Sequence, residues 1–297
     1  MAQRISTVVI PAAGQGTRLL PLTKSTPKEL LNVYDRPALQ FAIDEAIALG
    51  VDRIVVVMHP DKPAIRDYLT PDPAAIAALR AQGKAVLGDV LEGIAVPDGT
   101  EVVFVDQHQP RGLGHAILCA EQLVLPGPFA VILPDDLILD TPCLPEMAAQ
   151  YSDGHMIAAM EVLPEETASY GIFGLSRPSI GRCQQVSGMV EKPAAGRAPS
   201  RLAAVGRYVL DPSIFDTLKT TPQGTGGEIQ LTDAINRDGQ RLTLRAFRFS
   251  GTRYDCGSHD GLLGAAVACQ SAARTALDEG GRPAARTASR DPCLTPA

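Results

Sequence analysis

The chain has 297 residues, 45% hydrophobic and 20% charged, values that are typical of a soluble globular enzyme with a substantial core. Its 33 acidic and 27 basic side chains give a formal charge of −6, which argues against sequence-independent nucleic-acid binding. No apolar run approaches the roughly 20 residues that a membrane-spanning helix needs. No signal peptide follows Met1, so we expect a cytoplasmic protein that binds neither membrane nor nucleic acid.

Strand-like and helix-like segments alternate along the first half. β-branched or apolar runs predict strands at 5–10, 54–58, 101–105 and 129–133, and helical spacing predicts a helix from Pro37 to Gly50. Helix formers over 61–91, interrupted by Pro71 and Pro73, predict two further helices, and 114–123 predicts another. This alternation indicates an α/β fold that is Rossmann-like, with a mostly parallel central sheet and helices on both faces.

The second half is less regular. Short β-like pieces at 156–162, 185–190, 202–210 and 242–249 lie among turns rich in proline and glycine. We interpret them as a smaller α+β extension of the same domain, because no long linker precedes them. The expected organisation is one domain over 1–279, with halves of about 1–140 and 141–279, and a poorly ordered tail over 280–297.

A glycine-rich turn, Ala12-Ala13-Gly14-Gln15-Gly16-Thr17-Arg18, follows the first predicted strand. Glycines let a backbone approach a phosphate closely, and exposed N–H groups form an anion-binding nest. Arg18 adds a guanidinium that can bind phosphate. A tight turn without a ligand is the alternative. The turn is neither a dinucleotide-binding G-x-G-x-x-G motif nor a Walker A loop, which speaks against a Rossmann dehydrogenase and a P-loop kinase.

Two further patterns carry groups suited to phosphate chemistry. Pro27 fixes the backbone before Lys28, which aims its ammonium group. Asp135 and Asp136 end an apolar strand, where α/β proteins place ligands, and Mg²⁺ prefers such oxygen ligands. In contrast, the histidines and cysteines form no zinc-ligand set, so we expect reduced thiols and no zinc. A G-x-S-x-G hydrolase motif is also absent.

The stretch from Ala12 to Leu30 resembles the G-x-G-T-R…P-K-E signature of bacterial UTP–glucose-1-phosphate uridylyltransferases, within the sugar-1-phosphate nucleotidyltransferase superfamily. The resemblance covers roughly Ile5 to Ala268, in the expected order. Its other motifs are Pro37-Ala38-Leu39-Gln40, Gly112-Leu113-Gly114-His115-Ala116, Leu133-Pro134-Asp135-Asp136, Tyr170-Gly171, Glu191-Lys192-Pro193, Val205-Gly206-Arg207-Tyr208-Val209-Leu210 and Gly226-Gly227-Glu228-Ile229-Gln230-Leu231-Thr232-Asp233-Ala234. Several ordered motifs together are far more specific than one.

The resemblance implies the nucleotide-diphospho-sugar transferase fold, with a nucleotide-binding first half and a sugar-phosphate-binding second half. It implies nucleotide contacts from Ala12, Ala13, Gly14, Gly16, Thr17, Arg18, Lys28, Gln107, Gly112 and Gly114. It implies sugar-phosphate contacts from Asp136, Gly171, Glu191, Lys192 and Gly206, and a Mg²⁺ cofactor on Asp135 and Asp255. Arg18, Lys28 and Lys192 would be the catalytic residues.

The implied reaction joins UTP and glucose 1-phosphate into UDP-glucose and releases pyrophosphate. The attacking phosphate is already ionised, so no general base is required. The resemblance also implies a homodimer or homotetramer. Asp106, His108, Pro110 and Arg111 depart from the family pattern near the base-binding loop. Alternatives are therefore the same reaction with dTTP or another nucleotide, such as CTP, and a non-catalytic regulatory paralogue.

Overall fold

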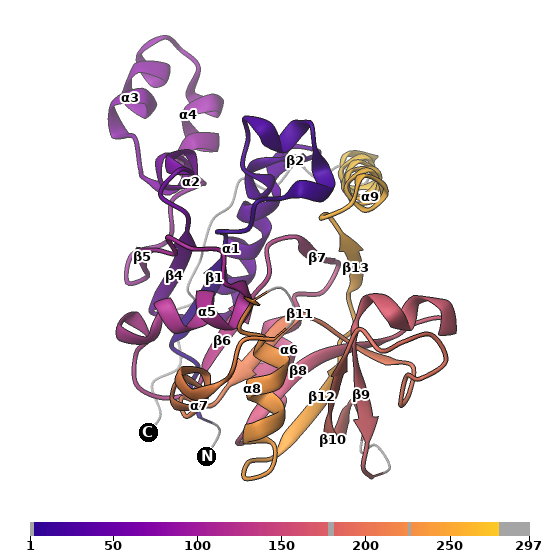
Figure 1. The fold of residues 1–297 in the computed structure, drawn as a ribbon. Helices are drawn as coiled ribbons and strands as arrows, with labels where there is room; N and C mark the ends of the chain where they lie inside the picture. Colours follow the sequence, from indigo (N-terminus) through magenta and orange to yellow (C-terminus); the bar gives the residue numbers. More distant parts are fainter. Residues whose placement is uncertain (1–2, 178–180, 225–226, 279–297) are drawn as a thin grey trace, which may run out of the picture.

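The computed structural model describes residues 3–177, 181–224 and 227–278. The predicted tail over 280–297, Gly226 and Cys293 lie outside these residues. Within them, one nine-stranded sheet has the order β5-β4-β1-β6-β11-β8-β12-β10-β9 (Figure 1).

The main sheet and two small ribbons account for the described strands. They are β1 (Thr7–Pro11), β2 (Asn32–Val33), β3 (Arg36–Pro37), β4 (Arg53–Met58), β5 (Glu101–Asp106), β6 (Phe129–Ile132), β7 (Asp136–Leu139), β8 (His155–Glu161), β9 (Gly171–Leu175), β10 (Cys183–Glu191), β11 (Leu202–Leu210), β12 (Leu244–Arg248) and β13 (Thr252–Asp255). The described α-helices are α1 (Ala38–Leu49), α2 (Pro63–Leu69), α3 (Pro73–Ala81), α4 (Ala85–Glu92), α5 (Gly112–Cys119), α6 (Cys143–Gln150), α7 (Ile214–Thr220), α8 (Leu231–Asp238) and α9 (His259–Asp278).

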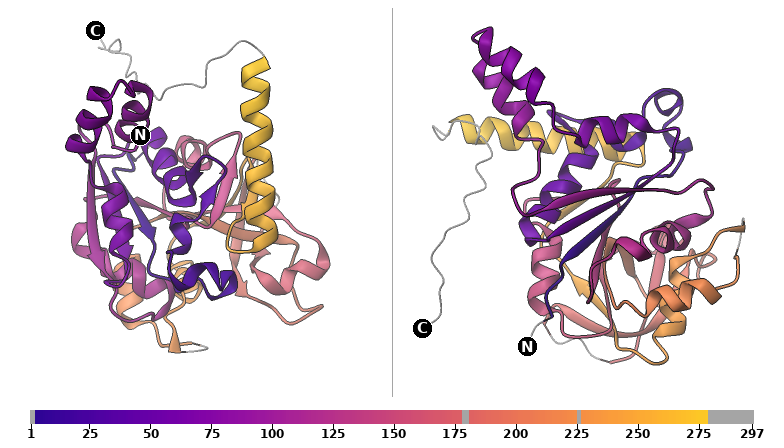
Figure 2. Two further views of the ribbon diagram at one scale, coloured as in Figure 1. Left: turned by 90° about the horizontal axis from the view of Figure 1, so that it is seen from above. Right: turned by 90° about the vertical axis from the view of Figure 1, so that its left-hand side faces the viewer.

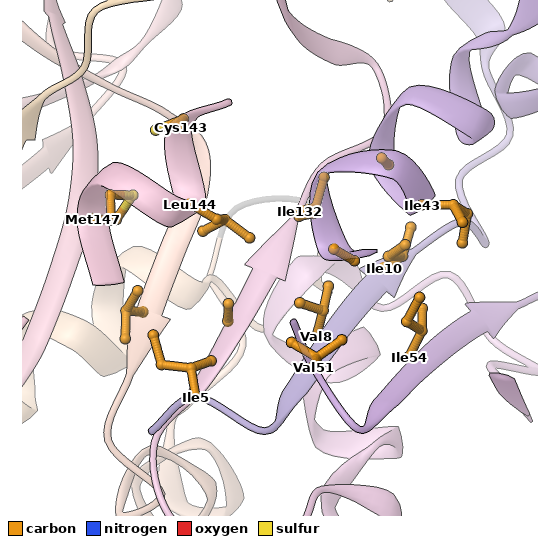
Figure 3. Packing of buried hydrophobic residues seen from close by; sticks show 14 of the residues in the cluster. Ile5, Val8, Ile10, Ile43, Val51, Ile54, Ile132, Cys143, Leu144 and Met147 are labelled. Atoms are coloured by element: carbon orange, nitrogen blue, oxygen red, sulfur yellow. The ribbon is translucent and has the colours of Figure 1, made fainter. Parts of the chain in front are cut away.

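Two hydrophobic layers cover the faces of the sheet, because successive strand residues point to opposite sides. Val8 and Ile10 of β1 pack with α1 and α6 on one face (Figure 3), whereas Val9 packs with α5, α7 and α8 on the other. Helix α1 begins and ends as predicted: Leu39, Ile43 and Ala46 are buried, and Gly50 closes it with a left-handed φ of 76°. The α/β fold with helices on both faces is therefore confirmed.

The sheet is mixed. Strands β5, β4, β1 and β6 run parallel to one another, as expected from the first half. Strand β11 runs antiparallel to β6 and β8, and β10 runs antiparallel to β9 and β12, whereas β12 is parallel to β8. Antiparallel neighbours need no crossover helix, so β9, β10 and β11 follow one another without a described α-helix between them, whereas α7 and α8 lie between β11 and β12. The single sheet spans both halves, and their division by substrate remains a prediction.

Residues 61–92 form three helices and not the predicted two. Gly83, with a φ of 74°, separates α3 from α4 and adds a break beyond those at Pro71 and Pro73. A side chain would be strained at this φ, so the glycine allows the extra turn. The α2–α4 segment projects from the body of the fold (Figure 2).

The described residues include five cysteines, all of them free and two of them buried. No helix in the described ranges has the length and apolar character required to cross a membrane.

Candidate active site

Four parallel strands place their carboxyl ends at one edge of the sheet. The glycine-rich loop follows β1, Lys62 follows β4, Gln107 follows β5, and Asp135 follows β6. Strand order moves from β1 to β4 and β5 on one side and returns to β6 on the other. Such a reversal opens a crevice beyond the strand ends, which is where open α/β sheets bind ligands.

The glycine-rich loop has a row of free backbone donors. The N–H groups of residues 13–18 make no hydrogen bond with any part of the chain that the structure describes. Gly16 has a φ of 66°, and a Cβ there would lie 3.0 Å from Thr23 Cγ2 and 3.1 Å from Lys28 Cβ. Glycine is therefore required for both conformation and space. The loop has the geometry of an anion-binding nest.

Ala12 supports this loop from below. It is buried, its N–H donates to Val57 O at 2.6 Å, and its carbonyl oxygen accepts from Lys62 Nζ at 2.9 Å. Lys62 Nζ also donates to Gly14 O at 2.5 Å and to Glu29 Oε2 at 2.9 Å. Sequence analysis assigned no role to Lys62 or Glu29. The available signal was a lysine next to a proline shortly after a predicted strand, Lys62-Pro63, although Lys28 follows its proline and Lys62 precedes it.

Lys28 connects the loop to the end of β6. Its Nζ donates to Asp135 Oδ2 at 2.5 Å, and its Cε lies 3.7 Å from where a Cβ on Gly14 would be. Burial alone would lower the pKa of Lys28, but the Asp135 and Glu29 carboxylates outweigh it and raise that pKa. Burial alone would raise the pKa of Asp135, but Lys28 outweighs it and lowers that pKa. Both groups are therefore charged near neutral pH.

Asp255 lies beside Asp135. Strand β13 pairs with β7 so that Asp255 is opposite Asp136, and Cys256 N donates to Asp135 O at 2.8 Å. A Cβ on Gly257 would lie 3.1 Å from Asp135 Oδ2 and 2.9 Å from Asp255 Oδ1, and it would collide with the Arg18 guanidinium. Two carboxylates and a cation thus converge on one point, although Asp135 and Asp255 are 120 residues apart in the sequence.

This pair fits a hard divalent cation. Mg²⁺ in nucleotide-dependent enzymes takes one or two carboxylates and completes its shell with phosphates and water. The described residues contain no group of three or more histidine, cysteine or acidic side chains able to hold a metal. Asp135 and Asp255 therefore suit a cation that is shared with a phosphorylated substrate, and a closed all-protein site is not formed.

Asp136 holds the neighbouring segments together. Its Oδ1 accepts from the Arg253 guanidinium, with Nε at 2.6 Å, and its Oδ2 accepts from Gly206 N at 2.9 Å. Arg253 Nη1 in turn donates to the Tyr170 hydroxyl at 2.8 Å. Both carboxylate oxygens therefore already have protein donors, so the sugar-phosphate contact predicted for Asp136 is untested and its visible contacts are structural. Sequence analysis gave Arg253 no role, because only the antiparallel pairing of β13 with β7 brings it next to Asp136.

A buried ion pair supports the turn between β6 and β7, which carries Asp135. Arg207 Nη2 lies 2.8 Å from Glu45 Oε2, and Arg207 Nη1 donates to Asp136 O at 2.6 Å. Sequence analysis quoted Arg207 within a motif without giving it a role. The carbonyl contact fixes the backbone immediately after Asp135.

Three of the predicted sugar-side residues, Gly171, Glu191 and Lys192, lie together at the β9–β10 end, and the other two, Asp136 and Gly206, contact each other. Glu191 is opposite Gly171, and a Cβ on Gly171 would lie 3.2 Å from Glu191 Oε2, which accepts from Thr232 Oγ1 at 3.0 Å. Lys192 is exposed, and its Nζ has no hydrogen bond or ion pair with the described residues. Its φ of 43° is uncommon for a residue with a side chain, and such strain concentrates at functional sites.

The predicted base-side loop is fixed by its own contacts. Gln107 Nε2 lies 3.2 Å from Gly112 O and 2.9 Å from His115 Nδ1. A carbonyl can only accept, so the amide nitrogen, and not the oxygen, faces Gly112. Burial, assisted by the charge of Arg111, lowers the pKa of His115. Because an amide nitrogen only donates, His115 Nδ1 is the acceptor in this contact. Gln107 Oε1 has no partner in the described residues and is not buried without one.

The two loop glycines differ in what they offer. A Cβ on Gly112, whose φ is 89°, would lie 2.8 Å from Glu228 Cβ, and one on Gly114 would lie 2.6 Å from Ile229 O. Gly114 N already donates to Ile229 O at 2.9 Å. Its N–H is therefore already paired within the protein. The position of its missing Cβ is also occupied, because Ile229 Cγ2 and Leu218 Cδ2 each lie 2.9 Å from it, so the nucleotide contact implied for Gly114 stays a prediction.

Comparison with known proteins agrees with this geometry. A family model described as nucleotidyl transferase matches residues 7–272. The chain belongs to that family. It is 41% identical over 265 residues to a UTP–glucose-1-phosphate uridylyltransferase of Staphylococcus epidermidis, covering 88% of this chain and 91% of that one. A Bacillus subtilis protein of the same name is 40% identical over 88% of this chain and 89% of its own length.

Solved structures of nucleotidyl transferase family members show the same fold. A UTP-bound UGPase from Acinetobacter baumannii has 37% identity and a TM-score of 0.83, covering 92% of this chain and 99% of that one. A UDP-glucose pyrophosphorylase complexed with UDP-glucose has 37% identity and a TM-score of 0.78, covering 90% and 99%. The sequence-based family resemblance is confirmed.

Proposed function

We propose that the chain catalyses the formation of UDP-glucose and pyrophosphate from UTP and α-D-glucose 1-phosphate. Family membership and the names of the relatives support this reaction. The observation that carries it is the convergence of a free backbone nest with Lys28, Asp135, Asp255 and Arg18 at one crevice. An anion-binding nest and paired carboxylates together suit a metal-bound triphosphate.

The nest and two cations would bind the triphosphate. The free N–H groups of residues 13–18, including those of Ala13, Gly14, Gly16 and Thr17, face no protein acceptor in the described chain. Arg18 is largely exposed and Lys28 reaches across the crevice, so both can neutralise phosphate oxygens. Positioned charges of this kind are the main source of catalysis in phosphoryl and nucleotidyl transfer.

Asp135 and Asp255 would hold Mg²⁺. When bound, the ion supplies charge neutralisation between the triphosphate and the incoming phosphate. The protein's part is to keep the two carboxylates on one point, through the β7–β13 pairing and the Cys256 N–H bond to Asp135 O.

Lys192 and Glu191 would bind the sugar phosphate. The unpaired ammonium of Lys192 suits the phosphate, and a carboxylate suits neighbouring hydroxyls. Gly171 leaves room for the hexose beside Glu191, whereas the space beside Gly206 is filled by Asp136 and Leu133, so a sugar contact at Gly206 would use its backbone. A phosphate oxygen of glucose 1-phosphate forms a bond to the α-phosphorus, and the bond from that phosphorus to the departing oxygen breaks. Pyrophosphate takes the electron pair, and no proton has to be removed from the attacking phosphate.

Gln107 would read the base. Its outward-facing Oε1 accepts a hydrogen bond, which complements the imide N–H of uracil. Cytosine carries an acceptor nitrogen at the same ring position. That nitrogen and Gln107 Oε1 would face each other with no proton between them, which is unfavourable. Thymine has the same N–H as uracil, so this contact does not discriminate between UTP and dTTP. The names of the relatives favour UTP.

A substrate panel tests the proposal. Pyrophosphate release is measured with UTP, dTTP, CTP, ATP and GTP against glucose 1-phosphate and other sugar phosphates, with Mg²⁺ and with a chelator. We expect the highest kcat/KM for the pair UTP and glucose 1-phosphate. We also expect the chelator to abolish this activity. A faster reaction with another pair would replace the proposed substrates, and no reaction with any pair would favour the regulatory paralogue.

We also propose a homodimer or homotetramer. The projecting helix α4 exposes Val86, Leu87 and Val90, the type of surface that subunit contacts cover. Light scattering after size exclusion gives the mass directly. A monomer at micromolar concentration would contradict this proposal.

A further inference from the structure

Lys62 and Glu29 form an ion pair directly beneath the glycine-rich loop. Their side chains are 13% and 0% exposed. An ammonium group has three donors, and Lys62 uses them on Ala12 O, Gly14 O and Glu29 Oε2. The second carboxylate oxygen of Glu29 is buried with no partner among the described residues.

The two carbonyl contacts determine which way the loop faces. The peptides joining Ala12 to Ala13 and Gly14 to Gln15 are trans, and a trans peptide points its C=O and N–H in opposite directions. Because Lys62 draws both carbonyl oxygens inward, the N–H groups of Ala13 and Gln15 point outward. Neither N–H bonds to the described part of the chain.

Stability alone does not account for this arrangement. Burial is the largest influence on both groups: it raises the pKa of Glu29 and lowers that of Lys62, although each charge opposes the effect on the other. A buried ion pair gives little net stability, because desolvation offsets the attraction. A glycine-rich loop, in contrast, can adopt many backbone conformations. A fixed ammonium that binds two of its carbonyl oxygens restricts the loop to one of them.

We propose that Lys62 is a positioning residue for the nucleotide triphosphate, with Glu29 holding its ammonium in place. Lys62 acts through the loop: it turns the carbonyls of Ala12 and Gly14 away from the ligand so that the opposite N–H groups meet the phosphates. It does not itself contact phosphate, which separates its role from those of Lys28 and Arg18. The inference rests on the proposed function and adds a residue to it.

The test compares Lys62→Met with the matched variant Arg182→Met. Arg182 makes a bidentate ion pair with Glu146, at 2.6 and 2.8 Å. It directly precedes β10, whereas Glu191 is the last residue of that strand, so Arg182 lies at the other end from the sugar-side residues. KM for UTP, KM for glucose 1-phosphate and kcat are measured, together with UTP affinity by titration calorimetry without sugar phosphate. Glu29→Gln keeps the side-chain shape, removes the charge and serves as a milder second variant.

Lys62→Met should raise KM and Kd for UTP by on the order of tenfold to a hundredfold, which corresponds to one lost hydrogen bond to a charged group. KM for glucose 1-phosphate and kcat should stay within about twofold, because ground-state binding of one substrate is weakened. Glu29→Gln should change UTP binding in the same direction by a smaller factor. Arg182→Met should change neither constant.

An unchanged UTP affinity in folded Lys62→Met, or equal rises in KM for the two substrates, would overturn the inference. If Lys62→Met does not fold, Glu29→Gln decides: wild-type UTP affinity in that variant overturns the role, and a selective loss supports it. A wild-type chain that neither binds UTP nor turns over would refute the proposed function and this inference together. Activity in the wild type with unaltered variants refutes only the role of Lys62.

Discussion

Replacing Gly206 by alanine tests how closely the turn that carries Asp135 must pack against β11. A Cβ on Gly206 would lie 2.6 Å from Asp136 Oδ2 and 2.8 Å from Leu133 Cβ. Non-bonded heavy atoms are most stable at about 3.5–4.0 Å, so the turn must move by roughly 1 Å. The Gly206 N–H bond to Asp136, 2.9 Å long, would be stretched by the same movement.

Both stability and turnover should fall in Gly206→Ala. Overpacking of this kind costs about 1–3 kcal/mol of unfolding free energy. Asp135 lies between the two displaced residues, and a shift of about 1 Å in a catalytic group can cost about 100-fold in rate. We therefore expect kcat to fall by about that factor, while KM for UTP changes much less, because the glycine-rich loop is not displaced.

Urea unfolding followed by circular dichroism gives the stability, and pyrophosphate release at saturating substrates gives kcat. Gly264→Ala in α9 is the matched control, since the nearest atom to its added Cβ is Tyr254 Cδ1 at an ordinary 3.6 Å. Alanine favours a helix over glycine by about 1 kcal/mol, so the control should be active and no less stable. Wild-type unfolding and wild-type kcat in Gly206→Ala would refute this account of the turn.

Four further outcomes are expected. Asp135→Asn should abolish Mg²⁺-dependent pyrophosphate release while keeping the circular dichroism spectrum; wild-type turnover would rule out its metal role. Lys192→Ala should raise KM for glucose 1-phosphate by roughly 10- to 100-fold and leave that for UTP unchanged, as loss of a charged hydrogen bond implies. Gln107→Leu should reduce the kcat/KM preference for UTP over CTP, and an unchanged ratio would exclude base reading. Hydrogen bonding to Arg182 lowers the pKa of Glu146 from 4.5 to about 2. The ionised carboxylate therefore stabilises the folded protein above pH 4.5, and this stabilisation is lost as the pH falls toward 2. In urea unfolding, Glu146→Gln should be less stable than the wild type at pH 7, and the difference in unfolding free energy should be smaller at pH 3.

The sequence predicted the first half of the fold well, because its signals are local. The continuous run of buried apolar residues Val8, Val9 and Ile10 and the helical spacing before Gly50 each lie within a dozen residues. The extra helix break at Gly83 was also local, but one glycine does not by itself determine whether a helix ends there. Strands β7, β9 and β13 were not predicted, since short antiparallel strands are stabilised by partners that are distant in sequence.

For the candidate site, the sequence alone determined which chemical groups the chain carries and in what order. The free N–H groups of 13–18 and the Lys28–Asp135 contact agree with the glycine-rich loop and strand-end carboxylates that sequence analysis selected. Only the tertiary structure decided which groups meet. Lys62 lies under the loop because β4 pairs in parallel with β1, and Asp255 joins Asp135 because β13 pairs with β7. Strand pairing and burial act between residues far apart along the chain, so a local pattern cannot contain them.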